Sequence, residues 1–211
     1  RETTHFSIID AEGNRVAATL SINYPFGSGF VPPGTGVLLN DEMDDFSARP
    51  GVPNAYGLVG GEANAIAPGR RMLSSMSPTF VDSERGVAIL GTPGGSRIIT
   101  TVLQGILAVS EGAPVEQWVS RPRIHHQYLP DRVQFEPAAL DPDAQALLAA
   151  KGHALEPQEW PFGNMQAIWW DRIGDSLSAA SDPRGIGDAQ VVAPQSSPPW
   201  RRPGPESQRG P

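Results

Sequence analysis

The run "TTHFSIIDAEGNRVAATLSI" at residues 3–22 decides the fold. Its two halves, residues 4–10 and 15–22, are rich in β-branched side chains and alternate between apolar and polar types. The tetrapeptide "AEGN" between them supplies a glycine and an asparagine, which are typical of a tight turn. The pattern predicts a β-hairpin over residues 4–22.

Two hydroxyl residues, Thr3 and Thr4, stand at the head of this hairpin. A threonine hydroxyl is a weak nucleophile unless a base lies beside it. A threonine at a chain terminus carries its own base, because cleavage of the preceding peptide bond frees an α-amine. Whether Thr3 is such a residue depends on what the rest of the chain brings to it.

The remaining pattern predicts an α+β fold. A second hairpin is expected from "PTFVD" and "VAILGTP", with "SERG" as its turn, and strands from "HALEP", "MQAIWWD" and "SLSAAS". Helices are expected at residues 96–110, 114–121 and 141–152, the last with Asp141 as N-cap and Pro142 at its first position. The Gly/Pro-rich region 25–78 holds a strand-like "GVLLN" and long loops. The elements do not alternate as they do in a doubly wound sheet.

Composition narrows the classes of function. Acidic residues outnumber basic ones by 23 to 16, which disfavours a broad nucleic-acid footprint. The chain has no cysteine, so thiol catalysis, disulfides and thiolate metal sites are excluded. No apolar run is long enough to cross a membrane. We expect one domain over residues 1–193 and a disordered Pro/Ser/Arg-rich tail over residues 194–211. The absence of an initiator Met suggests a C-terminal piece of a longer protein.

Three polar constellations could carry chemistry. Gly94 and Gly95 in "LGTPGGSRIITT" lie between a strand and a helix, where backbone N–H groups can bind an anion. These glycines could form an oxyanion hole, or a turn that serves only the packing of strand and helix. A phosphate site is disfavoured because the P-loop lysine is missing. Ser74 and Ser75 suit a carboxylate, although serine pairs are also common in turns.

The crowded carboxylates Glu42, Asp44 and Asp45 could receive a metal ion or a substrate ammonium group, or form a solvated acidic turn. Their spacing does not match an EF-hand. The adjacent His125 and His126 diverge on either a strand or a helix, so structural or surface roles are favoured over joint metal binding. We therefore predict neither a metal nor a cofactor.

Seven motifs together resemble, in order and spacing, the small subunit of γ-glutamyltranspeptidase (glutathione hydrolase), an N-terminal nucleophile hydrolase. The resemblance runs from about Thr3 to Arg184. The motifs are "TTHFSIID", "NYPFGSG", "GVLLNDEMDDFSARPGVPNAYGLVGGEANA", "LSSMSPT", "GTPGGSRIITTVLQ", "PRIHHQYLPD" and "ASDPR".

The resemblance implies a four-layer αββα sandwich and a precursor that cleaves itself, between Glu2 and Thr3, into a large and a small subunit. Thr3 matches the nucleophile, and Gly94 and Gly95 match the oxyanion-hole glycines. Ser21 stands where many members have a second, supporting threonine; it keeps the hydroxyl but not the methyl group. With Glu2 still attached, the amine of Thr3 is blocked and the chain is expected to be inactive.

The resemblance also implies the donor pocket. Asn23, Glu42 and Asp45 match the residues that hold the γ-glutamyl amino group, and Ser74 and Ser75 match those that hold its carboxylate. The position of Glu42 is occupied by glutamine in some bacterial members of the family. Tyr56, in a lid loop over residues 50–61, matches a gating tyrosine that reaches toward Asn23. The carboxylate-binding arginine belongs to the large subunit, which is the expected partner.

The implied function is hydrolysis or transfer of the γ-glutamyl group of glutathione and related amides to water, amino acids or peptides, without a cofactor, in the periplasm or outside the cell. Two alternatives remain. One is a cephalosporin (glutaryl) acylase of the same family, but the glutaryl group lacks the α-amine that the charges of Glu42 and Asp45 would bind. The other is a catalytically inactive binding relative.

Overall fold

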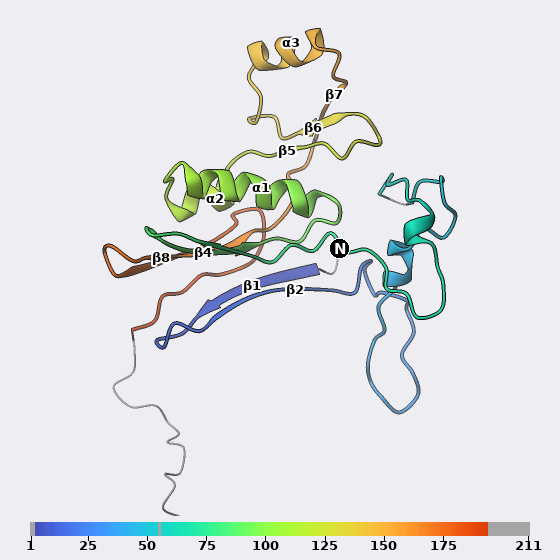
Figure 1. Ribbon diagram of the computed structural model, residues 1–211, viewed down its shortest axis with the longest axis horizontal. Helices are drawn as coiled ribbons and strands as arrows, with labels where there is room; N and C mark the ends of the chain where they lie inside the picture. Colours follow the sequence, from blue (N-terminus) through green and yellow to red (C-terminus); the bar gives the residue numbers. More distant parts are fainter. Residues whose placement is uncertain (1–2, 55, 194–211) are drawn as a thin grey trace, which may run out of the picture.

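The computed structural model describes residues 3–54 and 56–193 (Figure 1). Its helices are α1 (Arg97–Ser110), α2 (Val115–Ser120), α3 (Pro142–Ala150) and the short 3₁₀ helices η1 (Glu42–Asp45) and η2 (Glu62–Asn64). Its strands are β1 (Thr3–Ile9), β2 (Arg15–Ser21), β3 (Thr79–Asp82), β4 (Gly86–Gly91), β5 (Ile124–His125), β6 (Val133–Phe135), β7 (Leu155–Pro157), β8 (Gln166–Asp171) and β9 (Ser176–Ser181).

The predicted first hairpin is confirmed as the antiparallel pair β1–β2. Its turn is held by the Asp10 carboxylate, which accepts hydrogen bonds from the backbone amides of Glu12 at 2.9 Å and Asn14 at 2.8 Å. Gly13 adopts φ +82°, a conformation that favours glycine. The register places Thr3 opposite Ser21, so the two ends of the hairpin bring their hydroxyl residues together.

The second predicted hairpin, β3–β4, is extended by β8 and β9 into a four-stranded antiparallel sheet. Helices α1 and α2 pack on one face of this sheet and the β1–β2 hairpin lies against the other, in the order helix, sheet, sheet (Figure 1). The core joins Ala88 and Leu90 of β4 to Ile98 and Val102 of α1 and to Trp118 of α2. Strand β4 is buried along its whole length, so it anchors the loop that follows it.

A polar seam separates the two sheets. His5 is buried on the inner face of the hairpin, where its ring nitrogens lie 2.8 Å from Thr19 Oγ1 and 3.1 Å from Ser7 Oγ. Gly91 makes room for the ring, since a Cβ there would lie 2.3 Å from it. Burial lowers the pKa of His5 to about 4, so the imidazole is neutral at pH 7.

The outer face of the hairpin is apolar and exposed. Phe6 and Ile8 of β1 are 41% and 50% exposed, and Val16 and Leu20 of β2 are 42% and 54% exposed. The described residues therefore form an α, a β and a second β layer, and no helix among them covers this outermost sheet. These are three of the four layers of an αββα sandwich.

The predicted helices at residues 96–110, 114–121 and 141–152 are confirmed as α1, α2 and α3. Asp141 caps α3 as expected, accepting a hydrogen bond from the Ala144 amide at 2.7 Å. A small sheet, β5–β6–β7, carries α3 beyond the far side of α1 (Figure 1). No helix in residues 3–54 and 56–193 is long and apolar enough to cross a membrane.

The strand expected at "GVLLN" is wrong. Residues 36–40 form no strand but one arm of a projecting loop, in which the Leu39 amide donates to Phe30 O at 3.0 Å and the Leu39 carbonyl accepts from Ser28 N at 3.0 Å. Two prolines at positions 32 and 33, and glycines with positive φ at positions 34 and 36, prevent a continuous ladder of strand hydrogen bonds. The tail expected over residues 194–211 lies outside the described residues.

Candidate active site

The Thr3 hydroxyl lies at the mouth of the seam between the two sheets. Its Oγ1 is 2.9 Å from Ser21 Oγ, across the first pair of the hairpin. Ser21 Oγ also accepts the backbone N–H of Asn23 at 2.8 Å. That bond holds the serine hydroxyl in one orientation, so Ser21 fixes the position of the Thr3 oxygen without needing a β-branched side chain.

Gly94 and Gly95 form the turn between β4 and α1. Gly94 has φ +150° and Gly95 has φ +60°, both unfavourable for residues with a side chain. Their carbonyl groups accept the first amides of the helix, Arg97 N at 3.3 Å and Ile98 N at 3.1 Å. Their own N–H groups donate to no group in the described part of the chain. These donors are available to an oxyanion at the N-terminus of a long helix.

Tyr56 covers the Gly95 side of this turn. A Cβ on Gly95 would lie 2.8 Å from the tyrosine ring, and the ring stacks on that of Tyr24 with centroids 5.8 Å apart. The Tyr56 hydroxyl donates to Asn23 Oδ1 at 3.2 Å. Asn23 itself is buried with φ +68°, a left-handed conformation that asparagine tolerates and that turns its amide toward the site.

Glu42 and Asp45, both half-buried, lie on the 3₁₀ helix η1 and line the same cleft. Burial, together with the neighbouring carboxyl groups of Glu42, Asp44 and Asp41, raises the pKa of Asp45 to about 7. Glu42 Oε1 is buried without a hydrogen-bond donor among the described residues. At neutral pH the pair lacks a cation, so the site fits an ammonium group.

The raised pKa of Asp45 predicts that this residue favours the folded state at low pH and not at neutral pH. Asp45 binds its proton more tightly in the folded protein than in the unfolded one, so its contribution to the free energy of unfolding is greatest below its ordinary pKa of 3.8 and is lost as pH rises to about 7. In the substrate-free protein, Asp45→Asn should therefore raise the melting temperature at pH 8 and have no such effect at pH 3.5. Calorimetry at both pH values checks this, and equal effects at the two would contradict it.

Nine of the ten residues predicted for the site line one narrow cleft of about 30 Å³. They are Thr3, Ser21, Asn23, Glu42, Asp45, Tyr56, Ser74, Ser75 and Gly95. The tenth, Gly94, lies with Thr3 on an adjoining open cavity of about 480 Å³. Ser74 Oγ accepts the Met76 amide at 3.2 Å, which leaves its own hydroxyl hydrogen available. Residues from six separate stretches of the sequence thus line the two spaces next to Thr3.

Thr3 therefore separates two spaces of different chemistry. The narrow cleft on one side is polar and holds the carboxylates and paired serines. The larger cavity on the other side is walled by Pro93, Arg97 and residues 158–164, including the exposed Trp160. An amide bond placed at Thr3 would have its acyl part in the first and its amine part in the second. Sequence analysis missed this second wall, since nothing local links residues 158–164 to Thr3.

A buried ionic network fixes that wall. Glu136 accepts the Phe162 amide at 3.1 Å, Asp182 accepts the Met165 amide at 2.9 Å, and both carboxylates pair with Arg184. Arg123, 2% exposed, donates to Asp182 and to the Phe162 carbonyl. Charge-assisted bonds to a loop backbone hold it rigidly. The wall facing Thr3 is thus anchored to the folded core at Phe162.

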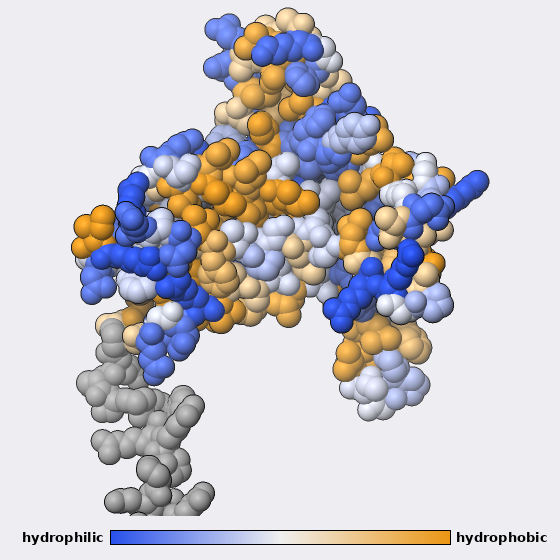
Figure 2. Space-filling view, viewed as in Figure 1, coloured by the Kyte–Doolittle hydropathy of each residue, from blue (hydrophilic) through white to orange (hydrophobic). Residues whose placement is uncertain are grey.

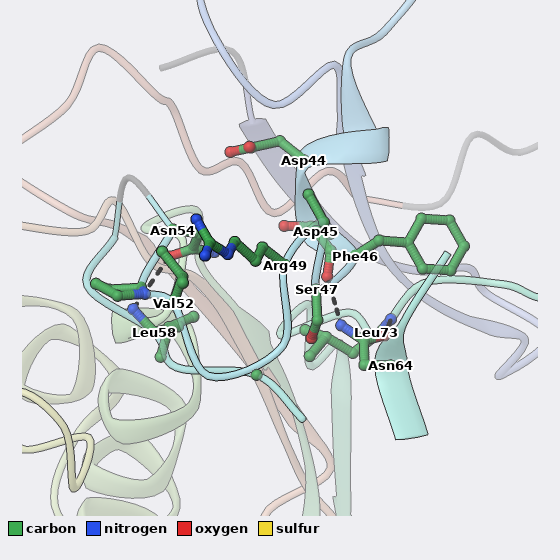
Figure 3. Close-up of a pocket in the computed structure, with 13 residues that line it drawn as sticks. Asp44, Asp45, Phe46, Ser47, Arg49, Val52, Asn54, Leu58, Asn64 and Leu73 are labelled. Carbon is green, nitrogen blue, oxygen red and sulfur yellow. Dashed lines mark hydrogen bonds between the residues drawn. The ribbon is translucent and has the colours of Figure 1, made fainter. Parts of the chain in front are cut away.

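A cavity of about 310 Å³ adjoins the cleft (Figure 3). It is lined in part by the loop over residues 48–61, which contains the lid loop expected over residues 50–61. Asp45 lines both spaces, whereas Asp44 lines only this outer one. Arg49, Val52 and Asn54 project into it from the loop (Figure 3). The two neighbouring aspartates therefore have different surroundings, although their positions in the sequence are adjacent.

The two adjacent histidines diverge. His125 is buried and faces Thr100 of α1, with 2.8 Å between Nδ1 and Oγ1, while His126 is 2.9 Å from Asp131 at the surface. No group of three His, Asp or Glu side chains in residues 3–54 and 56–193 is arranged to hold a metal ion.

The chain matches the family model described as Gamma-glutamyltranspeptidase over residues 1–192. It is 51% identical to the glutathione hydrolase proenzyme of Pseudomonas aeruginosa, covering 92% of this chain and 35% of that protein. It is 49% identical to the glutathione hydrolase proenzyme of Escherichia coli, covering 89% of this chain and 32% of that protein. The chain therefore spans about a third of the length of these relatives.

Among solved structures, the chain is similar to a γ-glutamyltranspeptidase from Pseudomonas nitroreducens complexed with L-DON. The TM-score is 0.80 at 50% identity, and the match covers 90% of this chain and 100% of that one. The matched chain thus corresponds in extent to this one.

Proposed function

This chain belongs to the γ-glutamyltranspeptidase family, and we propose that it is the nucleophile-bearing small subunit of a γ-glutamyl hydrolase or transferase. The observation that carries the proposal is the convergence of nine predicted residues on one cleft around the Thr3 hydroxyl. Glutathione and other γ-glutamyl amides are the substrates. The domain predicted over residues 1–193 carries this chemistry.

Maturation uses the Thr3 hydroxyl on its own backbone. Thr3 Oγ1 attacks the Glu2 carbonyl carbon, the Glu2–Thr3 peptide bond breaks as the acyl group moves from nitrogen to oxygen, and water hydrolyses the resulting ester. The products are a Glu2 carboxylate and a free Thr3 amine. Ser21, 2.9 Å from Thr3 Oγ1, orients the hydroxyl for this attack.

Turnover then uses the freed amine as the base. It takes the Oγ1 proton, directly or through one water, while the oxygen attacks the γ-carbonyl of the donor. The Gly94 and Gly95 amides stabilise the oxyanion, and the proton passes to the departing amine. Water or an acceptor amine resolves the γ-glutamyl ester. Glu42, Asp45 and Asn23 bind the donor ammonium group, and Ser74 and Ser75 bind its carboxylate.

The partner of this chain is the large subunit from the same precursor. Two exposed apolar surfaces support this: the outer face of the β1–β2 hairpin, and the projecting loop at the lower right of Figure 2, which is apolar over much of its length. In that loop Phe26 is 76% exposed and Val37 is 56% exposed. Large apolar patches on isolated chains mark interfaces. We place the assembled enzyme in the periplasm or outside the cell, as the family resemblance implies.

A donor comparison tests the function. The mature enzyme should hydrolyse γ-glutamyl-p-nitroanilide at least about 100-fold faster, in kcat/KM, than glutaryl-p-nitroanilide, because Glu42 and Asp45 stay unpaired when the donor lacks its ammonium group. Release of p-nitroaniline is measured for both. A preference for the glutaryl compound would assign the chain to the cephalosporin-acylase alternative. Turnover of neither compound would assign it to the inactive relatives.

A further inference from the structure

The motif "PRIHHQYLPD", to which the reaction gives no role, contacts the loop over the active site. Gln127 Nε2 donates to the backbone oxygen of Tyr56 at 3.0 Å. Next to it, Gly57 (φ +75°) packs against Pro130; a Cβ at that glycine would lie 3.0 Å from the proline ring. The segment over residues 125–131 thus meets the loop at the residue whose side chain lies over Gly95.

The Gln127 amide has only one workable orientation. Its NH₂ group faces two carbonyl oxygens, those of Tyr56 and Leu129, at 3.0 and 3.1 Å. Two acceptors require a donor, so Oε1 must face His125 Nε2, 2.7 Å away. His125 therefore carries its proton on Nε2, and its Nδ1 lies 2.8 Å from the Thr100 hydroxyl oxygen, which also donates to the backbone oxygen of Arg97 at 3.1 Å. Gln127 is aimed at the loop through a buried histidine anchored on α1.

Beside its stacking on Tyr24, Tyr56 is held through its backbone and its hydroxyl group. Gln127 holds its backbone, and Asn23 accepts its hydroxyl at 3.2 Å. With the loop in this place the cleft of about 30 Å³ has room for roughly two water molecules. A γ-glutamyl group needs more space, so the loop must move when the donor enters. It returns over the acyl-enzyme only if its anchors form again.

We propose that Gln127 is a positioning residue that returns the loop over residues 48–61 to its place above the acyl-enzyme and so limits hydrolysis relative to transfer. The inference rests on the proposed function, because it concerns the fate of the γ-glutamyl ester. Gln127 is suited to the task because it binds backbone of the loop and lines the outer side of the Gly94 turn together with Tyr56. It does not line the cleft around Thr3.

The test is Gln127→Glu in the mature two-subunit enzyme. The carboxylate still accepts the His125 proton but cannot donate to the two carbonyl groups. We expect chymotrypsin to nick the loop, at Tyr56 or Leu58, about fivefold faster than in wild type, as the loss of one neutral hydrogen bond implies. The ratio of hydrolysis to glycylglycine transfer with γ-glutamyl-p-nitroanilide should rise by a similar factor. Gln127→Met, which removes the donor without adding charge, should do the same.

Gln104→Glu is the matched control. Gln104 Nε2 also donates to two carbonyl groups, those of Thr100 at 2.9 Å and Ile124 at 2.8 Å, but it touches no residue of the loop. The control should leave nicking and product ratio unchanged. The proposal is overturned if either Gln127 variant matches this control in either measurement. If wild type does not turn over the donor, the proposed function fails, while nicking still tests the anchor by itself.

Discussion

Replacement of Thr3 by alanine should leave the precursor as one uncleaved polypeptide and lower γ-glutamyl turnover by about 10⁴-fold or more. Both effects have one cause. In the proposed mechanism the same oxygen breaks the Glu2–Thr3 bond and later carries the acyl group, and Ser21, 2.9 Å away, has no α-amine of its own to act as a base. Gel electrophoresis and N-terminal sequencing of purified precursor measure the first effect, and p-nitroaniline release measures the second.

The neighbouring Thr4 provides the control. It follows Thr3 directly, but alternation along β1 turns its side chain to the exposed outer face of the hairpin. Thr4→Ala keeps a small side chain on this face, which also carries the proposed contact with the large subunit, and leaves the cleft untouched, so the variant should mature and turn over within about twofold of wild type. A Thr3→Ala precursor that still yielded a small subunit beginning at residue 3 would overturn the assignment of the nucleophile.

Local sequence signals were sufficient where a structure depends on neighbours in the chain. The β1–β2 hairpin follows from alternation and a turn, and α1 follows from apolar side chains at helical spacing, of which Ile98 and Val102 are buried. "GVLLN" has the composition of a strand but lacks a partner strand among the described residues. Propensity alone cannot supply one, because a strand is stabilised by cross-strand pairs.

Some features of the candidate site are likewise indicated by local sequence patterns, and others depend on the folded chain. The sequence could indicate the Gly94–Gly95 turn and the acidic cluster, because each is a local pattern. The local pattern could not separate Asp45 from Asp44, and only the family resemblance did so; the folded chain places Asp45 in the cleft and the outer cavity but Asp44 in the outer cavity alone. The roles of Gln127 and Trp160 depend on contacts across many tens of residues. The family resemblance supplied the assignment of Tyr56 and of the paired serines.

Replacement of Asp45 by asparagine should lower kcat/KM for γ-glutamyl-p-nitroanilide by about 10²–10³-fold, mostly through KM. A charge-assisted hydrogen bond to the donor ammonium group is lost, and that group then enters a buried site with one charge partner fewer. Glutaryl-p-nitroanilide carries no ammonium group, so its low rate should change by less than about threefold. Steady-state rates for the two compounds, measured side by side, separate loss of donor recognition from general damage.

Asp44→Asn removes the same charge one residue away and is the matched control. Because Asp44 lines the outer cavity and not the cleft, its loss should raise KM by no more than about threefold, as expected for a screened charge. The Asp45 variant should also melt at a higher temperature than wild type at pH 8, because its carboxylate is uncompensated until substrate arrives. A weaker donor site in a more stable protein is the combination that an ammonium receptor requires. Equal kinetic losses in the two variants would show instead that the whole acidic cluster, and not Asp45, recognises the donor.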